Sequence, residues 1–202
     1  MPVVEGRQYR SFSAENLSAK TDESDNYIVE GYATTFDDAY DMGWGWSEKI
    51  DRHALDGADL SDVIFQYDHS GMVMARNRNG SLAFLPDDHG LYVRADLGGT
   101  REGRDLHEAI KAGLVDRMSW AFMVDPEDGW EYDRDSKTSI VKRITKVYDV
   151  SAVSSPANDG TEIKARSYLD GVIEAERLEQ SLRQKRRDTA MAAARLRLYR
   201  LE

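Results

Sequence analysis

The chain has no cysteine among its 202 residues. This absence excludes disulfide bonds, thiolate zinc sites and a cysteine nucleophile together. Any covalent catalysis must therefore use serine, threonine, lysine or a carboxylate as the nucleophile.

Long apolar runs are also missing, because no stretch approaches the ~20 apolar residues that span a bilayer. The first residues lack the basic-then-apolar pattern of a signal peptide. We therefore expect no membrane partner and a cytoplasmic location, unless an assembly carries the protein elsewhere. The length and a hydrophobic fraction of 41% predict one soluble globular domain with a tail.

Basic residues are too few for general DNA binding, since the formal net charge is −10. The charge is uneven: residues 171–202 hold eight basic and five acidic residues, a net of +3, and the remainder carries −13. The sequence therefore predicts no direct nucleic-acid partner. The basic tail either contacts an acidic surface or is an ordinary solvated helix.

Short β-branched and aromatic runs, separated by turn residues, are typical of strands. They fall at 27–36, 63–67, 81–85, 91–97, 118–124 and 138–154. Helical spacing is clearest at residues 102–112 and returns from about residue 165. Because helices do not regularly follow strands, the pattern favours a mainly β (α+β) protein, a mostly antiparallel barrel or sandwich. The predicted parts are an N-terminal arm, a β domain and a basic helical tail, at residues 1–25, 26–166 and 167–202.

Common site motifs are absent: there is no G-x-S-x-G, P-loop, G-x-G-x-x-G or H-E-x-x-H. The four histidines show no familiar metal-ligand spacing. His53 and His107 are expected on the surface. We predict no cofactor and no metal. One alternative stays open, a metal-dependent hydrolase using Asp68, His69, Asp87 and His89.

Three polar residues stand out against apolar strands. His69 lies where the strand at 63–67 stops, a place that holds a side chain rigidly and leaves it accessible to act as a general base. Ser119 interrupts an apolar run, as either a small core residue or a nucleophile. Asp149 also interrupts one, and a buried carboxylate is costly unless it is paired. Together they supply the parts of a Ser-His-Asp triad, although the sequence alone does not show that they meet.

Several short blocks follow one another between residues 27 and 166. They are Gly-Tyr-Ala at 31–33, Phe-Gln-Tyr-Asp-His at 65–69 with Arg76 after it, Gly-Ser-Leu at 80–82, Asp-His-Gly-Leu at 88–91, Met-Ser-Trp-Ala-Phe at 118–122 and Asp-Val-Ser-Ala-Val-Ser-Ser-Pro-Ala at 149–157. In this order they resemble the prohead maturation proteases of tailed bacteriophages, caudovirus relatives of herpesvirus assemblin.

The resemblance implies a serine endopeptidase with His69 as general base, Ser119 as nucleophile and Asp149 as the acidic member. It also implies a closed antiparallel β-barrel of the assemblin type with flanking helices and a C-terminal helix. Three positions depart from the family pattern. Asp149 replaces a frequent Glu, Asp68 replaces a common Asn, and Ala75 replaces a usual Gly.

The resemblance further implies a place and a substrate. Such proteases are enclosed in the immature prohead, in the host bacterial cytoplasm, and cut the scaffold, or the scaffold-like segment of the major capsid protein, and themselves. Their assemblin relatives are activated by dimerisation, so a homodimer or higher homo-oligomer is expected. Separately, the switch in charge and spacing predicts that a tail from about residue 165 addresses the protease to the scaffold or shell and is removed by self-cleavage. The alternative for the tail is a helix that packs on the barrel or forms a dimer contact. The alternative is a non-catalytic capsid assembly or structural β-barrel protein, in which Ser119 and His69 lie apart or the cleft is blocked.

Overall fold

The computed structural model describes residues 6–12, 17–21, 27–43, 45–154 and 183–184. The chain divides into a unit of Glu5–Glu162 and a second unit of Met1–Val4 with Ile163–Glu202, of which only residues 183 and 184 are described. The first unit is mainly β, with three sheets and one α-helix among its described residues. Among the described residues, no helix is long and apolar enough to cross a membrane.

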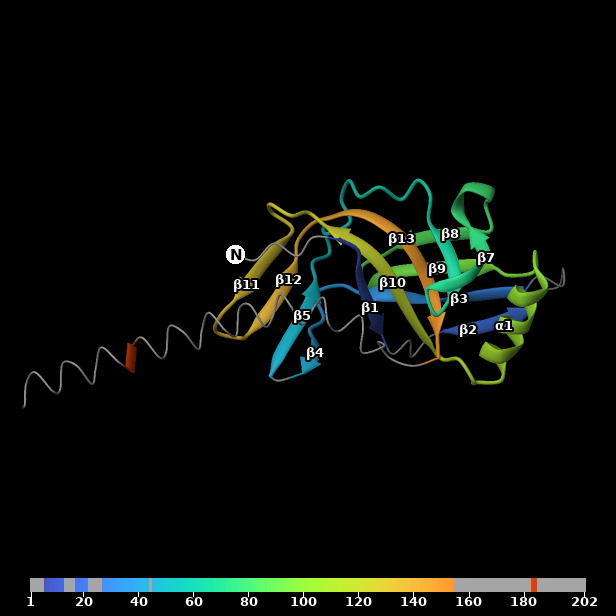
Figure 1. The fold of residues 1–202 in the computed structure, drawn as a ribbon, viewed down its shortest axis with the longest axis horizontal. Helices are drawn as coiled ribbons and strands as arrows, with labels where there is room; N and C mark the ends of the chain where they lie inside the picture. Colours follow the sequence, from blue (N-terminus) through green and yellow to red (C-terminus); the bar gives the residue numbers. More distant parts are fainter. Residues whose placement is uncertain (1–5, 13–16, 22–26, 44, 155–182, 185–202) are drawn as a thin grey trace, which may run out of the picture. The chain divides into compact units, whose positions relative to one another are not determined.

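The first sheet carries the long central strands of the fold (Figure 1). Its strands, in spatial order, are β1 (Gln8–Phe12), β10 (Arg117–Val124), β13 (Ile144–Val153), β6 (Ile64–Tyr67) and β7 (Ser70–Arg76). Strand β13 runs parallel to β6, whereas the other three pairings are antiparallel. Strand β10 therefore has β1 on one side and β13 on the other.

Two four-stranded sheets complete the unit. The second sheet is antiparallel, in the order β2 (Ser18–Thr21), β3 (Tyr27–Thr35), β9 (Gly90–Asp96) and β8 (Leu82–Pro86). The third sheet, at the opposite end of Figure 1 from the helix, is β11 (Trp130–Asp133), β12 (Thr138–Val141), β5 (Trp46–Ile50) and β4 (Tyr40–Gly43). In this sheet β12 and β5 pair in parallel.

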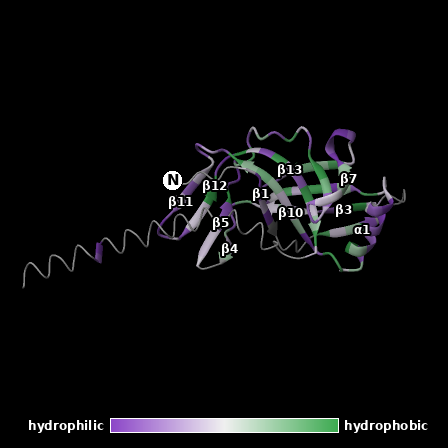
Figure 2. Ribbon diagram, viewed as in Figure 1, coloured by the Kyte–Doolittle hydropathy of each residue, from purple (hydrophilic) through white to green (hydrophobic). Residues whose placement is uncertain are grey.

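The main core lies where β10 of the first sheet packs against β3 of the second. Strand β10 is buried along most of its length, and Trp120 and Phe122 on it are fully covered, with ring centroids 4.3 Å apart. Burying each such aromatic side chain contributes about 1.5–3 kcal/mol. Figure 2 shows hydrophobic colours along these central strands. This packing makes β10 and β13 a rigid base for polar side chains on their other face.

The helix α1 (Arg101–Lys111) confirms the predicted helix. The Thr100 hydroxyl oxygen accepts a hydrogen bond from the Gly103 N–H at 2.9 Å, as an N-cap does. Leu106 and Ile110, four residues apart, form its buried face.

The prediction that His107 faces water is wrong. Its side chain is fully buried, with Nε2 3.2 Å from the carbonyl oxygen of Lys20 and its ring 5.2 Å from the ring of Tyr27. Strand β2, formed by part of the predicted N-terminal arm, packs on α1 and supplies the cover. The segment around His53 forms a series of turns, and His53 is exposed as expected.

The predicted closed antiparallel barrel is not found in the described residues. The ladder breaks between β7 and β8, because the 3-10 turn η1 (Asn77–Asn79) carries the chain from the first sheet to the second. Strand β1, at the other edge of the first sheet, has no pairing with the second sheet. The sheets are therefore open, and two pairings are parallel.

The strand predictions succeed where apolar residues alternate. Strands β8 and β9 form as predicted, and the segment 138–154 holds the two strands β12 and β13, which belong to different sheets. Strands β4, β5, β7 and β11 lie outside the segments expected to form strands. The arm at 1–25 contributes β1 and β2. The predicted basic tail at 167–202 lies outside the described residues, apart from residues 183 and 184.

Gly90 tests the close approach of β9 to β3. A Cβ at Gly90 would lie 2.1 Å from the backbone oxygen of Thr34, whereas a Cβ at Gly99 would have nothing within 4 Å. We expect Gly90→Ala to lower the free energy of unfolding by about 1–3 kcal/mol, because the backbone of β3 or β9 must shift to make room for the added methyl group. Gly99→Ala is the matched control and should change it by less than about 0.5 kcal/mol. Urea denaturation checks both, and equal values for the two variants would contradict this packing.

Candidate active site

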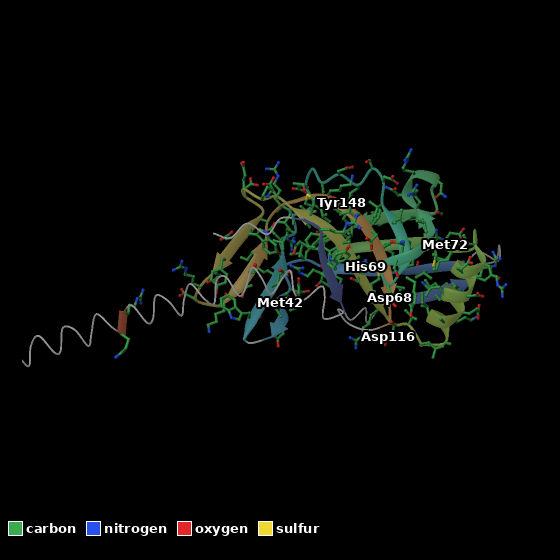
Figure 3. All side chains as sticks on the ribbon, in the orientation of Figure 1. Met42, Asp68, His69, Met72, Asp116 and Tyr148 are labelled. Atoms are coloured by element: carbon green, nitrogen blue, oxygen red, sulfur yellow. The ribbon has the colours of Figure 1, made fainter. Side chains whose placement is uncertain are left out.

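His69 is held at the tip of the tight hairpin between β6 and β7. Tyr67 pairs with Ser70, so Asp68 and His69 form a two-residue turn, with φ values of 47° and 53°. Two-residue hairpins of type I′ need positive φ at both central positions, and Asn, Asp and His tolerate it better than other residues with side chains. The turn therefore explains why a polar pair stands there, and it projects the imidazole over the first sheet (Figure 3).

Ser119 and Asp149 come from neighbouring strands of the same sheet. Ser119 lies on β10 opposite Ser151 of β13, and Asp149 lies on β13 opposite Ala121 of β10. Because side chains alternate along a strand, all four point to one face, away from the Trp120 core. The strand pairing therefore sets the distance between the hydroxyl and the carboxylate.

The three sequence-predicted residues meet in one hydrogen-bonded chain. His69 Nδ1 is hydrogen-bonded to the Asp149 carboxylate, and His69 Nε2 lies 2.6 Å from Ser119 Oγ. With Nδ1–H donating to the carboxylate, Nε2 is the nitrogen that can accept the serine proton. Ser119 is fully buried and Asp149 is 1% exposed, whereas the His69 side chain keeps 16% of its surface.

Two further residues support the buried Asp149 carboxylate. Ser151, two positions along β13, donates its hydroxyl to Asp149 Oδ1 at 3.1 Å. Arg7 places a guanidinium nitrogen 3.7 Å from Oδ2, and its guanidinium lies 3.9 Å from the centroid of the Tyr148 ring. These contacts compensate for removing a carboxylate from water.

The N-terminal strand β1 covers the site. The Ser119 hydroxyl lies 2.9 Å from the carbonyl oxygen of Arg10, so that oxygen and His69 Nε2 are both within reach of its single proton. The ring of Tyr9 packs edge-on against the His69 ring, with centroids 4.8 Å apart. The N-terminal segment therefore contacts all three residues of the site. Arg7 contacts Asp149, Tyr9 contacts His69 and Arg10 contacts Ser119.

The Arg10 side chain lies on the other face of the sheet, where it pairs with a buried carboxylate. Its guanidinium forms a two-pronged ion pair with Glu48 of β5, with Nη2 2.9 Å from Oε2, and the Tyr40 hydroxyl also donates to Glu48. Arg10 is 5% exposed and Glu48 is 3% exposed. Burial alone would lower the pKa of Arg10, but attraction and hydrogen bonding to Glu48 raise that pKa above its usual value. Burial, and then the Glu48 charge, raises the pKa of Tyr40.

The residues of the metal alternative are engaged elsewhere. The Asp68 carboxylate accepts from the N–H and hydroxyl of Ser154, both at 3.0 Å. Asp87 accepts from the Tyr32 hydroxyl at 2.7 Å, and the His89 ring packs on that of Tyr32. Across the ranges that the structure describes, no group of three or more His, Asp or Glu side chains could hold a metal ion.

Sequence reasoning missed Ser151, Arg7, Tyr9, Arg10 and Glu48. Ser151 could have been predicted from the sequence, because residues two positions apart on a strand lie on the same face, and Ser151 is two positions from Asp149. The pairing of Arg10 with Glu48 joins positions 38 apart through the third dimension, and nothing in the polar arm marks it.

The chain is similar to one protein family and to two known phage proteins. The model of one family, described as the caudovirus prohead serine protease, matches residues 15–172. The prohead protease of Enterobacteria phage HK97 is 30% identical over 157 residues, which cover 77% of this chain and 67% of that protein. The solved capsid assembly protease of bacteriophage T4 is 12% identical, with a TM-score of 0.46, and the match covers 75% of this chain and 100% of that one.

Proposed function

The chain belongs to the caudovirus prohead serine protease family, and from this we propose that Ser119, His69 and Asp149 are its catalytic triad. The observation that carries the proposal is the continuous chain of contacts from the Asp149 carboxylate through both ring nitrogens of His69 to Ser119 Oγ, the last step being 2.6 Å. Nucleophile, base and orienting acid are within hydrogen-bonding reach, as acyl transfer by serine requires.

The chemistry proceeds in two halves. Ser119 Oγ attacks the carbonyl carbon of the substrate peptide while His69 Nε2 takes its proton, and Asp149 stabilises the resulting imidazolium through Nδ1. The C–N bond then breaks as the leaving amine takes the proton from Nε2. A water molecule attacks the acyl-serine by the same route, which releases the new carboxylate and restores the serine.

The substrate proposed for this enzyme is the scaffold-like segment of the major capsid protein, or a separate scaffold, together with the protease itself. The HK97 relative is named a prohead protease, which places that enzyme in the immature capsid. We propose the same place for this chain, within the host bacterial cytoplasm, with homo-oligomers forming at the high concentration inside the shell. The net charge of −10 supports a protein substrate without direct nucleic-acid contact.

Either of two features would favour the non-catalytic structural alternative: Ser119 and His69 side chains that lie apart, or a blocked cleft. The 2.6 Å contact opposes the first. The second is met in one respect, because β1 occupies the sheet edge beside β10 and Ser119 is fully buried. A substrate must therefore displace β1 to reach the nucleophile.

Serine-directed and metal-directed inhibitors test this chemistry directly. With the cognate major capsid protein as substrate, we expect a serine-directed fluorophosphonate to abolish cleavage and a chelator to leave the rate within about twofold, because the proposed steps use protein groups alone. Gel analysis of the capsid protein checks both arms. Loss of cleavage with the chelator, restored by added metal, would instead favour the metal-dependent alternative.

A further inference from the structure

Strand β1 has the position that a substrate strand needs at this site. It is the edge strand of the first sheet and pairs antiparallel with β10, in a register that sets Ser11 opposite Ser119. Proteins commonly bind extended peptides by adding them as a strand to a sheet edge. Here the added strand comes from the chain's own N-terminal residues, ahead of the region from residue 15 that the family model matches.

The contact with Ser119 identifies one peptide bond of β1. Ser119 Oγ lies 2.9 Å from the Arg10 carbonyl oxygen, so the carbonyl that faces the nucleophile is that of the Arg10–Ser11 bond. The contact is a hydrogen bond to the carbonyl oxygen, and it places Ser119 Oγ beside this peptide group of β1.

The Arg10 side chain occupies a pocket built for a cation. Glu48 is 3% exposed and holds the guanidinium by two contacts, and Tyr40 donates its hydroxyl to the same carboxylate. The two parallel N–H groups of a guanidinium can bind both oxygens of a carboxylate at once. A lysine ammonium binds a carboxylate with less geometric specificity, and a neutral side chain brings no charge to pair with it. If β1 leaves, Glu48 loses its buried partner, which is unfavourable until another cation arrives.

The geometry points to two roles. Strand β1 occupies, within the same chain, the position that a substrate strand takes during cleavage. Glu48 selects Arg, and next Lys, as the residue immediately before the bond that is cut. This inference rests on the proposed function, because it takes Ser119 as the nucleophile. It adds a substrate class: segments of capsid or scaffold protein that can lie extended along β10 with a basic residue at this position.

Cleavage of a peptide that resembles β1 would follow the same two halves of acyl transfer. Ser119 Oγ forms a bond to the arginine carbonyl carbon, and His69 takes the hydroxyl proton. The bond to the following nitrogen breaks, and that nitrogen receives the proton as a free amine. Water then hydrolyses the acyl-serine, so the arginine ends with a carboxylate.

A synthetic peptide with the sequence of residues 4–17, which contains the Arg10–Ser11 bond, is the probe. Two further peptides carry Arg10→Lys and Arg10→Gln. The full-length wild-type protein should cut the first peptide between Arg10 and Ser11, as mass spectrometry of the products shows, and Ser119→Ala should not. We expect kcat/KM for the glutamine peptide to be lower by about 100-fold, because a buried carboxylate is left unpaired. The lysine peptide should fall between the two.

The pocket is tested by Glu48→Gln, with Glu30→Gln as the matched control, since Glu30 pairs with Lys20 in the second sheet. Glu48→Gln should reduce the preference for arginine over glutamine peptide to below about tenfold, and Glu30→Gln should keep the wild-type ratio. Because Glu48→Gln strands the buried Arg10, the double variant Arg10→Gln/Glu48→Gln, which removes both charges, is measured beside it. The double variant should show the same loss of preference.

Three results would overturn the inference. They are equal rates for the arginine and glutamine peptides, an unchanged ratio in the soluble Glu48 variants, and no cut at Arg10–Ser11 by a protein that cleaves its capsid substrate in a Ser119-dependent way. Absence of Ser119-dependent cleavage of every substrate is a different outcome. It would contradict the proposed triad itself, so the two failures are distinguishable.

Discussion

Ser119→Ala is expected to lower kcat/KM on the capsid substrate by at least about 10⁴-fold, because it removes the hydroxyl that contacts His69 Nε2 and forms the acyl intermediate. The residue is fully buried, and alanine fills the same place without Oγ. The variant loses the hydroxyl whose single proton can be donated to Arg10 or to His69, which costs about 1–2 kcal/mol of folding free energy. Cleavage kinetics and urea denaturation therefore separate loss of catalysis from loss of fold.

Ser139→Ala is the matched control for that experiment. Ser139 is also a buried serine, 3% exposed, but it lies on β12 in the third sheet. Its removal should leave kcat/KM within about twofold, since it touches none of the reacting groups. Comparable loss of activity in the two variants would show that activity depends on buried serines generally and would remove the special role of Ser119.

Asp149→Asn is expected to lower kcat by about 10³–10⁴-fold while the protein stays folded, a loss of the size that the same change causes in trypsin-type triads. The asparagine side chain can turn an N–H toward His69 Nδ1. The ring proton then sits on Nε2, where it faces Ser119 Oγ, so that nitrogen cannot accept the serine proton. Nitrogen NMR of the ring should show the proton moved from Nδ1 to Nε2.

Asp149→Glu is the control for charge at that position, because glutamate often stands there in the family that the sequence resembles. It retains a carboxylate that can accept from Nδ1, so we expect it to keep far more activity than Asp149→Asn. Equal activity of Asp149→Asn and wild type would show that His69 is oriented by other contacts, such as the packing of Tyr9 on its ring.

The sequence was informative where local patterns decide the structure. The i,i+4 pair Leu106 and Ile110 and the alternation along β9 are local patterns, and α1, β8 and β9 form where the sequence predicts them. One polar residue at the end of an apolar strand, His69, and two that interrupt apolar strands, Ser119 and Asp149, were also found from the sequence, and the structure brings them together. Their positions are marked because burying a polar group demands a partner.

The remaining features depend on pairings between distant segments. The polar stretch around Arg10 gives no strand signal of its own, and it becomes β1 because β10 offers an unpaired edge and Glu48 offers a charge partner. His107 was misplaced for the same reason, since β2 covers it from far away in the sequence. Closure of the barrel was inferred from resemblance, and the break at η1 has no counterpart in hydrophobic periodicity.

We propose that Ser119 is a nucleophile activated by His69, and covalent labelling with a fluorophosphonate tests this most directly. The wild type, His69→Ala and Ser119→Ala are labelled and analysed by intact mass and peptide mapping. We expect one adduct per chain, on Ser119, in the wild type, strongly reduced labelling in His69→Ala and none in Ser119→Ala. An adduct on another serine, or equal labelling of Ser119 with and without His69, would contradict it.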